Sequence, residues 1–317
     1  MANEKATRQG YAEGLLILGE KDENVIVLDA DLAGATYTGK FKAKFPERFF
    51  DCGIAEQNMM GIAAGLSLSG FTVFASSFAM FAAGRAFEQI RNSIGYPHLN
   101  VKIAATHAGI SVGEDGASHQ CNEDIALMRS IPGMTIINPA DAVEARAAVL
   151  AAAEYEGPVY LRFGRLAVPQ IFSKTSYKFD WGKGAQLTEG NDVAIIATGL
   201  MVNEALQAAE ALKNDDIHAR VINIPTIKPL DEEIVVNAAK ECGCVITAEE
   251  HNIYGGLGSA VCETLCENCP TPVYRVGVED VFGRSGPAKD LLHIYGLDAA
   301  HIISAAQTAV SKKNGTV

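Results

Sequence analysis

The sequence predicts an α/β protein with two domains, each built on a mostly parallel sheet that helices flank. Short apolar runs of strand length alternate with longer helical runs, which is the pattern of a parallel sheet covered on both faces. A polar segment, SKTSYKFDWGKG at residues 173–184, interrupts this alternation, and the same pattern then starts again. The 317 residues suffice for two domains that each have a core. We therefore expect domains at residues 1–175 and 186–317.

The first predicted domain is the larger one. Its strands are expected at VIVLD, FTVFASS, VKIAAT, GMTIINP and PVYLRF. Helices are expected from Ala55 onward, at residues 78–95, and at the alanine-rich residues 141–157, where Gly157 ends the helix. The second domain repeats the pattern with strands at DVAIIATG, ARVINIPT, CVITAEE and PVYRVGV. Its helices are expected at MVNEALQAAEALKN, DEEIVVNAAKE and GLGSAVCETLCEN.

Composition excludes several classes of function. The formal net charge of −12 would repel a phosphate backbone, so no nucleic-acid partner is expected. The start MANEKATRQG has no apolar run typical of a secretory signal, and we expect a cytoplasmic protein. Residues 57–84 carry no charge and are long enough to span a membrane. Glycines and serines interrupt them, however, so we expect a buried helix, strand and helix there and no membrane span.

The seven cysteines are scattered, which is typical of reduced thiols in a cytoplasm. Cys262, Cys266 and Cys269 have a C-x3-C-x2-C spacing that could hold an iron–sulfur cluster. The first two lie one turn apart on a predicted helix, whereas cluster thiolates must converge. We therefore expect ordinary thiols, and no metal ligands in this chain.

Residues 104–120, AATHAGISVGEDGASHQ, are the segment most informative about function. A strand runs into a glycine-rich loop that holds His107, Glu114, Asp115 and His119. Glycines let a ligand approach the backbone closely, and open α/β sheets bind ligands at the carboxyl ends of their strands. A surface loop that has gathered polar residues is the alternative.

Two further groups are ambiguous on their own. Glu56 stands at a strand-to-helix turn, where a carboxylate either caps the helix or serves a function. Phe78 and Phe81 lie three residues apart on one face of a predicted helix. They are either core residues or the walls of a slot that binds a ring.

Taken in order, several motifs resemble one family. GIAEQNM, SSFAMFAAG, ATHAGISVGEDGASHQ, PGMTIINPAD and GRLAVPQI resemble the pyrimidine-binding domain of transketolases and of their sister enzymes, the 1-deoxyxylulose-5-phosphate synthases. The later ATG, EEH and GGLGSAV stretches resemble the C-terminal domain of transketolases. The resemblance covers nearly the whole chain. It implies the thiamine-diphosphate pyrimidine-binding fold and transfer of a two-carbon ketol unit from a phosphorylated ketose to an aldose phosphate, as in the pentose phosphate pathway.

The resemblance also implies a cofactor site. Glu56 matches the glutamate that hydrogen-bonds N1′ of the aminopyrimidine, Phe78 and Phe81 match the aromatic slot around that ring, and Asp115 matches a residue beside the reactive carbon. A carboxyl group kept partly protonated in an apolar pocket favours the imino form of the pyrimidine, whose 4′ nitrogen then serves as base for C2. The cofactor itself acts as the electron sink.

The sugar side of the site is implied in the same way. His107 and His119 match proton-relaying residues that face the ketose, Arg8 and Arg165 match arginines that hold its phosphate, and Asp31 matches a polar residue at the mouth of the site.

The chain departs from the family pattern at some positions. Ala55 and Gln57 stand where many full-length transketolases have Arg and His, and Gly84 replaces a third aromatic residue. The deoxyxylulose synthases are more similar around Glu56. These differences bear on the identity of the substrate more than on that of the cofactor.

The family's diphosphate and Mg²⁺ motif, Gly-Asp-Gly followed by Asn, does not occur in this sequence. The resemblance therefore implies a partner, an N-terminal transketolase subunit that carries this motif, and a heterotetramer with two chains of each kind and interfacial cofactor sites. Rival interpretations are a 1-deoxyxylulose-5-phosphate synthase-like enzyme, the β subunit of a 2-oxo-acid dehydrogenase, a flavin- or nicotinamide-binding protein using Gly255-Gly256-Leu257-Gly258, and a non-catalytic scaffold.

Overall fold

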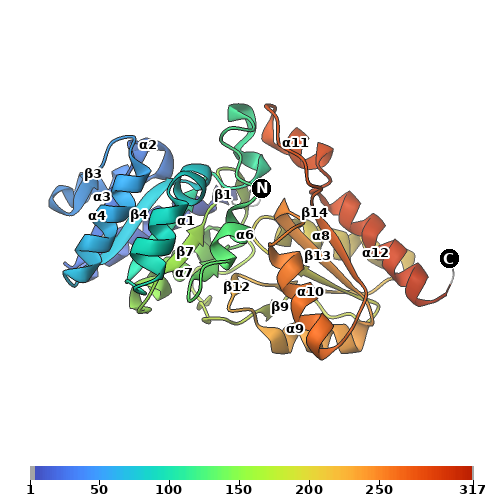
Figure 1. Cartoon of the computed structure of the whole chain (residues 1–317). Helices are drawn as coiled ribbons and strands as arrows, with labels where there is room; N and C mark the ends of the chain where they lie inside the picture. Colours follow the sequence, from blue (N-terminus) through green and yellow to red (C-terminus); the bar gives the residue numbers. More distant parts are fainter. Residues whose placement is uncertain (1–3, 316–317) are drawn as a thin grey trace.

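Two sheets, each rich in parallel strands, stand side by side in the computed structural model, which describes residues 4–315 (Figure 1). The strands of the larger sheet are β2 (Val25–Asp29), β3 (Phe49–Asp51), β4 (Thr72–Phe78), β5 (Val101–Thr106), β6 (Thr135–Ile137), β7 (Val159–Arg162) and β12 (Thr226–Lys228). They lie in the order β12-β6-β7-β5-β4-β2-β3. All neighbours are parallel except β12 and β6. The predicted α/β class with mostly parallel sheets is confirmed.

Helices cover both faces of the larger sheet, because its strands are apolar on both sides. Val27 of β2 belongs to the cluster that packs under α1 (Thr7–Lys21) and α7 (Ala142–Glu154). The next residue, Leu28, belongs to the opposite cluster, which packs under α4 (Glu56–Leu68). This alternation follows from the period of two along a strand.

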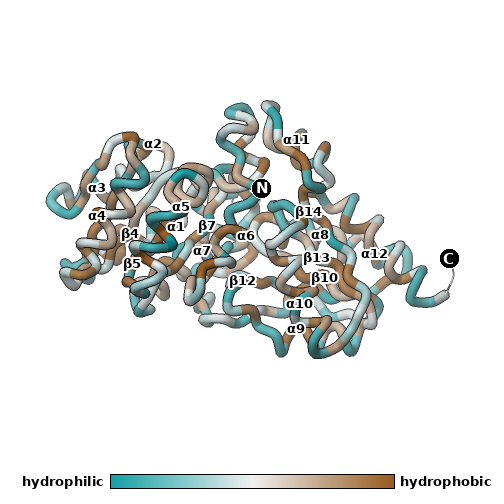
Figure 2. The backbone as a smooth tube through the Cα atoms, in the orientation of Figure 1, coloured by the Kyte–Doolittle hydropathy of each residue, from teal (hydrophilic) through white to brown (hydrophobic). Residues whose placement is uncertain are grey.

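The smaller sheet is built in the same way. Its strands are β9 (Ala185–Gln186), β10 (Val193–Ala197), β11 (Ala219–Asn223), β13 (Val245–Asn252) and β14 (Val273–Val278), in the order β14-β13-β10-β11-β9. One face is covered by α8 (Met201–Leu212) and α12 (Ala299–Lys313), and the other by α9 (Glu232–Cys242) and α10 (Leu257–Asn268). Along α12, hydrophobic and hydrophilic residues alternate, as expected for a helix that buries one side (Figure 2).

Shorter elements complete the chain. A two-stranded ribbon joins β1 (Glu4–Ala6) to β8 (Ala167–Pro169), and a 3₁₀ turn at Ile110–Asp115 follows β5. The remaining short helices are α2 (Ala33–Thr36), α3 (Gly39–Lys44), α5 (Phe87–Gln89), α6 (Asp124–Arg129) and α11 (Ala288–Ile294), with 3₁₀ turns at Pro46–Arg48 and Lys213–Asp215. No helix within residues 4–315 combines the length and apolar character needed to cross a membrane.

The helix predicted at residues 78–95 is wrong at its start. Phe78 pairs with Thr106 of β5 and is the last residue of β4. The helical part that follows consists of two π-helical turns, Met80–Arg85 and Ile90–Gly95, with α5 between them.

The strand predicted at residues 219–226 is in fact two elements in different sheets. β11 ends at Asn223, and Pro225, which has no N–H to donate to a ladder, separates it from β12. β12 then pairs antiparallel with β6 and extends the larger sheet. The domain boundaries expected at residues 175 and 186 stay a prediction. β12 does not fit them, because it follows residue 186 in the sequence but pairs within the larger sheet.

Candidate active site

Most of the predicted site residues gather at the carboxyl ends of β4 and β5. Phe78 ends β4, and His107 directly follows β5. Phe81 lies in the π-helical turn after β4, and His119 lies at the far end of the loop after β5. Adjacent parallel strands bring these segments to one edge of the sheet, where α/β proteins bind ligands.

Glu56 is the first residue of α4 and is 1% exposed. Its Oε2 atom accepts a hydrogen bond from Nη1 of Arg85 at 2.7 Å, and its Oε1 atom accepts one from the hydroxyl of Ser77 at 3.3 Å. The predicted apolar surroundings are therefore wrong in one respect, because a half-exposed guanidinium pairs with this carboxylate.

Four rings form a cluster beside this carboxylate. The Phe78 and Phe81 rings are 5.9 Å apart and nearly parallel, although the two residues do not share a helical face as predicted. The His107 ring stacks on Phe78 at 3.8 Å, and the edge of His119 meets Phe81 at 5.2 Å. The Arg85 guanidinium lies 4.6 Å above the centre of the Phe81 ring.

His107 is buried and neutral at physiological pH. Nη1 of Arg8 donates to its Nε2 atom at 3.2 Å, and arginine can only donate. Nδ1 therefore carries the proton, which it donates to the Thr106 hydroxyl at 2.9 Å. Burial, helped by the positive charges of Arg8 and Arg165, lowers the pKa of His107 to about 3. Its backbone φ of 56° is uncommon for a residue other than glycine.

Arg8 and Arg165 line one cavity of about 260 Å³, together with Ser111, Glu114 and Ala288. Nη1 of Arg165 donates to the Val112 carbonyl and to the Glu114 carboxylate. Nη1 of Arg8 donates to the Ala35 carbonyl at 2.6 Å. Burial, together with the nearby charge of Arg165, lowers the pKa of Arg8, so an anion between the two guanidinium groups would be favoured electrostatically.

Two predicted site residues lie at the rim. Asp115 is exposed, and its carboxylate is 4.0 Å from Nη1 of Arg165. Asp31 is exposed after the end of β2 with a φ of 60°, and its N–H donates to the Asp51 carboxylate at 3.1 Å.

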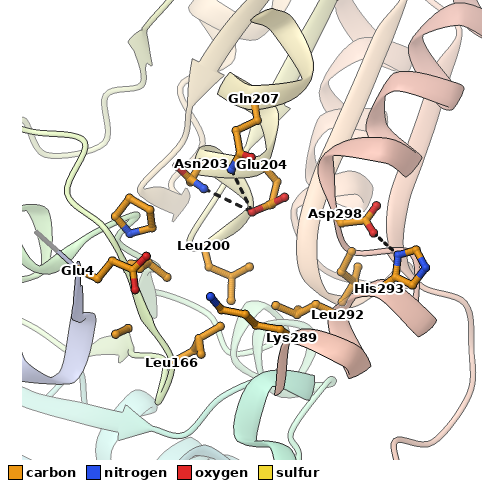
Figure 3. A pocket seen from close by; sticks show the side chains of 14 residues that line it. Glu4, Leu166, Leu200, Asn203, Glu204, Gln207, Lys289, Leu292, His293 and Asp298 are labelled. Atoms are coloured by element: carbon orange, nitrogen blue, oxygen red, sulfur yellow. Dashed lines mark hydrogen bonds and ion pairs between the residues drawn. The ribbon is translucent and has the colours of Figure 1, made fainter. Parts of the chain in front are cut away.

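A second cavity adjoins the first. It has a volume of about 360 Å³ and shares Leu166 and Ala167 with the Arg8–Arg165 cavity (Figure 3). Lys289, Leu200 and Glu4 point into it from three separate segments of the chain (Figure 3). None of the predicted site residues lines it.

The cysteines lie apart from the one group of side chains within residues 4–315 that converge as metal ligands could. Cys262 and Cys266 lie on α10, and all seven cysteines are free thiols. Within residues 4–315, the one set of three potential metal ligands that converge is His293, Asp298 and His301. Asp298 caps α12 and accepts hydrogen bonds from both imidazoles, at 2.7 and 2.6 Å, and these bonds bring the three side chains together.

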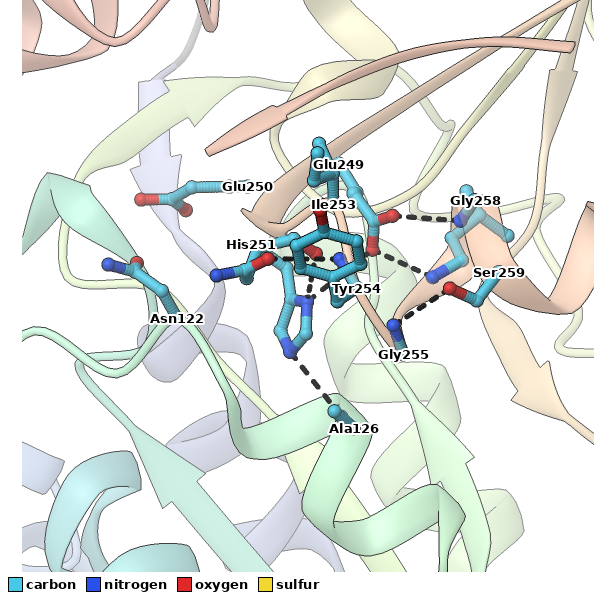
Figure 4. A network of polar contacts seen from close by, with 12 residues as sticks. Asn122, Ala126, Glu249, Glu250, His251, Ile253, Tyr254, Gly255, Gly258 and Ser259 are labelled. Atoms are coloured by element: carbon cyan, nitrogen blue, oxygen red, sulfur yellow. Dashed lines mark hydrogen bonds and ion pairs between the residues drawn. The ribbon is translucent and has the colours of Figure 1, made fainter. Parts of the chain in front are cut away.

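The dinucleotide interpretation of Gly255–Gly258 is wrong. The carboxylate of Glu249 accepts hydrogen bonds from the N–H groups of Leu257 at 2.7 Å and Gly258 at 2.8 Å, at the start of α10 (Figure 4). The position that a phosphate would occupy at this helix N-terminus is therefore filled by the chain itself.

Sequence reasoning missed two residues that contact the site. Arg85 pairs with Glu56, and the only signal was that Arg85 is the first charged residue after Glu56 in the sequence. Glu250 of β13 bonds the N–H of Ser111 at 2.6 Å, from a position 139 residues away in the chain. Burial raises the pKa of its carboxyl to about 7, against the effect of Arg162.

Comparisons with known proteins agree with this architecture. Residues 3–170 match the transketolase pyrimidine binding domain, and residues 182–302 match the transketolase C-terminal domain. A chain of Methanocaldococcus jannaschii, provisionally named as a transketolase C-terminal section, is 52% identical over 98% of both chains. A 6-deoxy-6-sulfo-D-fructose transketolase subunit of Clostridium is 44% identical over 97% of this chain and 95% of its own.

Solved structures give the same result. A structure described as a split gene transketolase, inactive beta4 tetramer, superimposes with a TM-score of 0.91 and 55% identity, over 97% of this chain and 99% of its own. A Pichia stipitis transketolase has the same fold, with a TM-score of 0.84 at 23% identity over 99% of this chain, which spans 47% of that enzyme. This chain belongs to the transketolase family and carries the pyrimidine-binding and C-terminal domains found in the C-terminal section of its split members.

Proposed function

We propose that this chain is a subunit of a thiamine-diphosphate-dependent transferase that moves a two-carbon ketol unit from a phosphorylated ketose to an aldose phosphate. The observation that carries the proposal is the placement of a buried carboxylate, an aromatic cluster and a two-arginine cavity along one edge of the larger sheet. The transketolase family supplies the class of reaction.

The residues around Glu56 fit the aminopyrimidine of the cofactor. Glu56 offers a buried oxygen, Oε1, whose one partner among residues 4–315 is the Ser77 hydroxyl at 3.3 Å, so a ring nitrogen could replace this weak bond. The faces of Phe78 and Phe81 would hold the ring by stacking. When bound, the cofactor supplies the electron sink for breaking a C–C bond.

His107 and the two arginines are placed to hold the ketose. Neutral His107 can accept a hydrogen bond from a sugar hydroxyl at Nε2 in place of the one from Arg8, without a charge change. The His119 ring meets Phe78 and Phe81 edge-on. Arg8 and Arg165 offer planar donors for a phosphate or another terminal anion. Glu114, exposed and paired with Arg165, would have to release it when the anion binds.

The diphosphate and Mg²⁺ ligands are expected from a partner subunit with the Gly-Asp-Gly motif, in a heterotetramer of two chains of each kind. Relatives named as sections or subunits of transketolases support a divided enzyme. The related structure described as an inactive β4 tetramer supports self-association of this kind of chain without a partner.

The experiment mixes this chain with its Gly-Asp-Gly partner. Calorimetry would measure thiamine diphosphate binding, with Mg²⁺, to each chain and to the mixture. Turnover would be measured with xylulose 5-phosphate, 6-deoxy-6-sulfofructose and an uncharged ketose, because relatives bear the names of different sugars. We expect tight binding and turnover only in the mixture. Tight binding and turnover by the isolated chain would contradict the divided arrangement.

Variants of the two-arginine cavity test recognition of the anion. Arg8→Ala or Arg165→Ala should raise KM for anionic donors, phosphorylated or sulfonated, roughly 10- to 100-fold and leave uncharged donors nearly unchanged. Lys289→Ala, in the neighbouring cavity, is the matched control and should leave KM unchanged. Equal effects on both donor types would contradict this role.

A further inference from the structure

The loop after β5, which carries His107 and the residues that anchor Arg165, is held in place from the other half of the chain. Glu250, on β13 of the smaller sheet, directs its carboxylate to the N–H of Ser111 at 2.6 Å. Both residues are at least 96% buried, so this bond is shielded from water. Its loss would leave a buried donor without a partner.

The backbone of the loop is shaped around this carboxylate. Gly109 has a φ of 80°, and a Cβ atom at this position would lie 2.3 Å from the carboxyl carbon of Glu250. A side chain at residue 109 would therefore clash with Glu250 as well as strain the backbone. Gly109 lies two residues from His107, and Val112, the carbonyl partner of Arg165, lies one residue from Ser111.

A second contact from the same half supports the loop further along. The side-chain amide of Gln120 donates to the carbonyls of Ile110 and Gly113 within the loop and of Arg284 in the segment before α11. Gly116 packs closely against this segment, since a Cβ atom added to it would lie 2.5 Å from the Ser285 hydroxyl oxygen. The loop is thus fastened at both ends to segments that follow residue 245.

The neighbouring residue, Glu249, provides an internal contrast. It is 1% exposed and also accepts backbone N–H bonds, two of them, but it points to the opposite side of β13, toward α10 (Figure 4). The carboxylates of Glu249 and Glu250 therefore both accept hydrogen bonds from backbone N–H groups, but in two different segments of the chain.

We infer that Glu250 is a positioning residue for the transfer reaction, because its carboxylate holds the Gly109–Ser111 backbone and through it His107 and the Arg165 anchor. This inference rests on the proposed function. The smaller sheet would thus help to position the active site. The hydrogen bond from Gln120 to the Arg284 carbonyl supports the same loop.

Hydrogen–deuterium exchange of the full chain tests the anchor without requiring activity. Glu250→Ala should speed exchange of the amides at residues 109–112 and leave those of Leu257 and Gly258 protected. Glu249→Ala should do the reverse. Unchanged exchange at residues 109–112 in Glu250→Ala would overturn the inference.

Kinetics of the complex with the partner test the consequence. Glu250→Ala should lower kcat/KM roughly 10- to 100-fold, since small displacements of a reacting group are costly. Glu250→Gln, which keeps an oxygen for Ser111, should recover most of this loss, and Glu249→Ala should have little effect. Thiamine diphosphate binding should be unchanged in all three variants. An equal loss in Glu249→Ala, or no recovery in Glu250→Gln, would overturn the positioning role. A wild-type complex without ketol transfer would instead refute the proposed function, and the exchange pattern would still decide whether Glu250 anchors the loop.

Discussion

The carboxylate of Glu56 has two hydrogen-bond partners within the part of the chain that the structure describes, and the two bonds differ in strength. Arg85 binds Oε2 at 2.7 Å with a full positive charge, whereas Ser77 binds Oε1 at 3.3 Å. The Arg85 bond is short and joins two opposite charges, whereas the Ser77 donor is neutral and its bond is long, so the Ser77 side is the one a ligand can take over. The proposed hydrogen bond to a ring nitrogen would therefore form at Oε1, with Arg85 keeping the carboxyl group oriented.

Glu56→Gln tests this role, because it keeps the shape and removes the acidic group. We expect the assembled complex to fold and to lose activity by roughly 10²- to 10⁴-fold, the usual scale for acid–base groups. Exchange of deuterium at C2 of bound thiamine diphosphate would measure the step directly. Glu88→Gln, an exposed carboxylate on α5, is the control. Exchange at the wild-type rate in Glu56→Gln would contradict the assignment.

His107 makes the stability of the chain depend on pH. Its pKa in the folded chain is about 3, below the ordinary value of about 6.5 that applies when the chain is unfolded. Between these two values only the unfolded state binds the proton, so stability falls as the pH falls. At pH 5 this single group should cost about 2 kcal/mol of the free energy of unfolding relative to pH 7.5.

Urea unfolding at pH 7.5 and pH 5 would measure this effect. His107→Asn should lose less stability between the two pH values than the wild type, whatever its absolute stability. The exposed His218→Asn should behave like the wild type. A pH dependence that is the same in His107→Asn and the wild type would show that His107 is not the group responsible.

At the scale of elements, α7 shows how one side chain joins a helix to a loop. Asp141 precedes α7, and its Oδ1 atom accepts the N–H groups of Val143 and Glu144. Its Oδ2 atom accepts those of Ile171 and Phe172, in the segment that leads out of the larger sheet. The carboxylate is fully buried, so all four donors depend on it.

Asp141→Ala should therefore destabilise the chain by about 2–4 kcal/mol, more than an ordinary cap, because two further buried donors lose their partner. Asp298→Ala, which removes the partly exposed cap of α12, should cost only about 0.5–2 kcal/mol. Denaturant unfolding of both variants would give the comparison. Equal losses would mean that the segment at residues 171–172 is held by other contacts.

Most strands and helices could be predicted from hydrophobic periodicity, because residues such as Val27 and Leu28 alternate between two buried faces. α1 was missed because its three glycines weaken the helical pattern. Two of them face α7: a Cβ at Gly10 would lie 2.1 Å from the Ala142 carbonyl oxygen, and one at Gly14 would lie 2.7 Å from Val149. The need for close helix packing overrides propensity there, and this need is visible only in three dimensions.

The candidate site was predictable where it follows a strand end and not where it depends on distant segments. His107 and Phe78 meet because β4 and β5 are neighbours, which is expected of consecutive parallel strands. Arg85 and Glu250 reach the site through side-chain packing that no spacing in the sequence encodes.

At the scale of the whole molecule, the two sheets depend on each other. β12 protects the edge of β6, and the Lys228 ammonium donates to the carbonyls of Arg129 and Ile131. The buried guanidinium of Arg162, on β7, donates to the backbone carbonyl of Glu250 at 2.9 Å. Each of these contacts joins the larger sheet to residues that follow it in the chain.

A fragment that ends at residue 185 should therefore not behave as an independent unit. It would expose the edge of β6 and leave Arg162 without one acceptor, so we expect aggregation or a much lower Tm than that of the full chain. Adding residues 186–317 as a separate fragment should restore cooperative unfolding. Size-exclusion chromatography and thermal melts would show this. A monomeric fragment with the Tm of the full chain would contradict it.

The strand Thr226–Lys228 also constrains how such chains can be inherited. It belongs to the second half by its position in the gene and to the first half by its hydrogen bonds to β6. A recombination event that exchanged the second half between relatives would replace β12 with the strand of another protein. That strand would then have to pair with β6 of the original larger sheet. Viable chimeras should therefore either cross over after residue 228 or bring a strand whose side chains match Ile136 and Ile137.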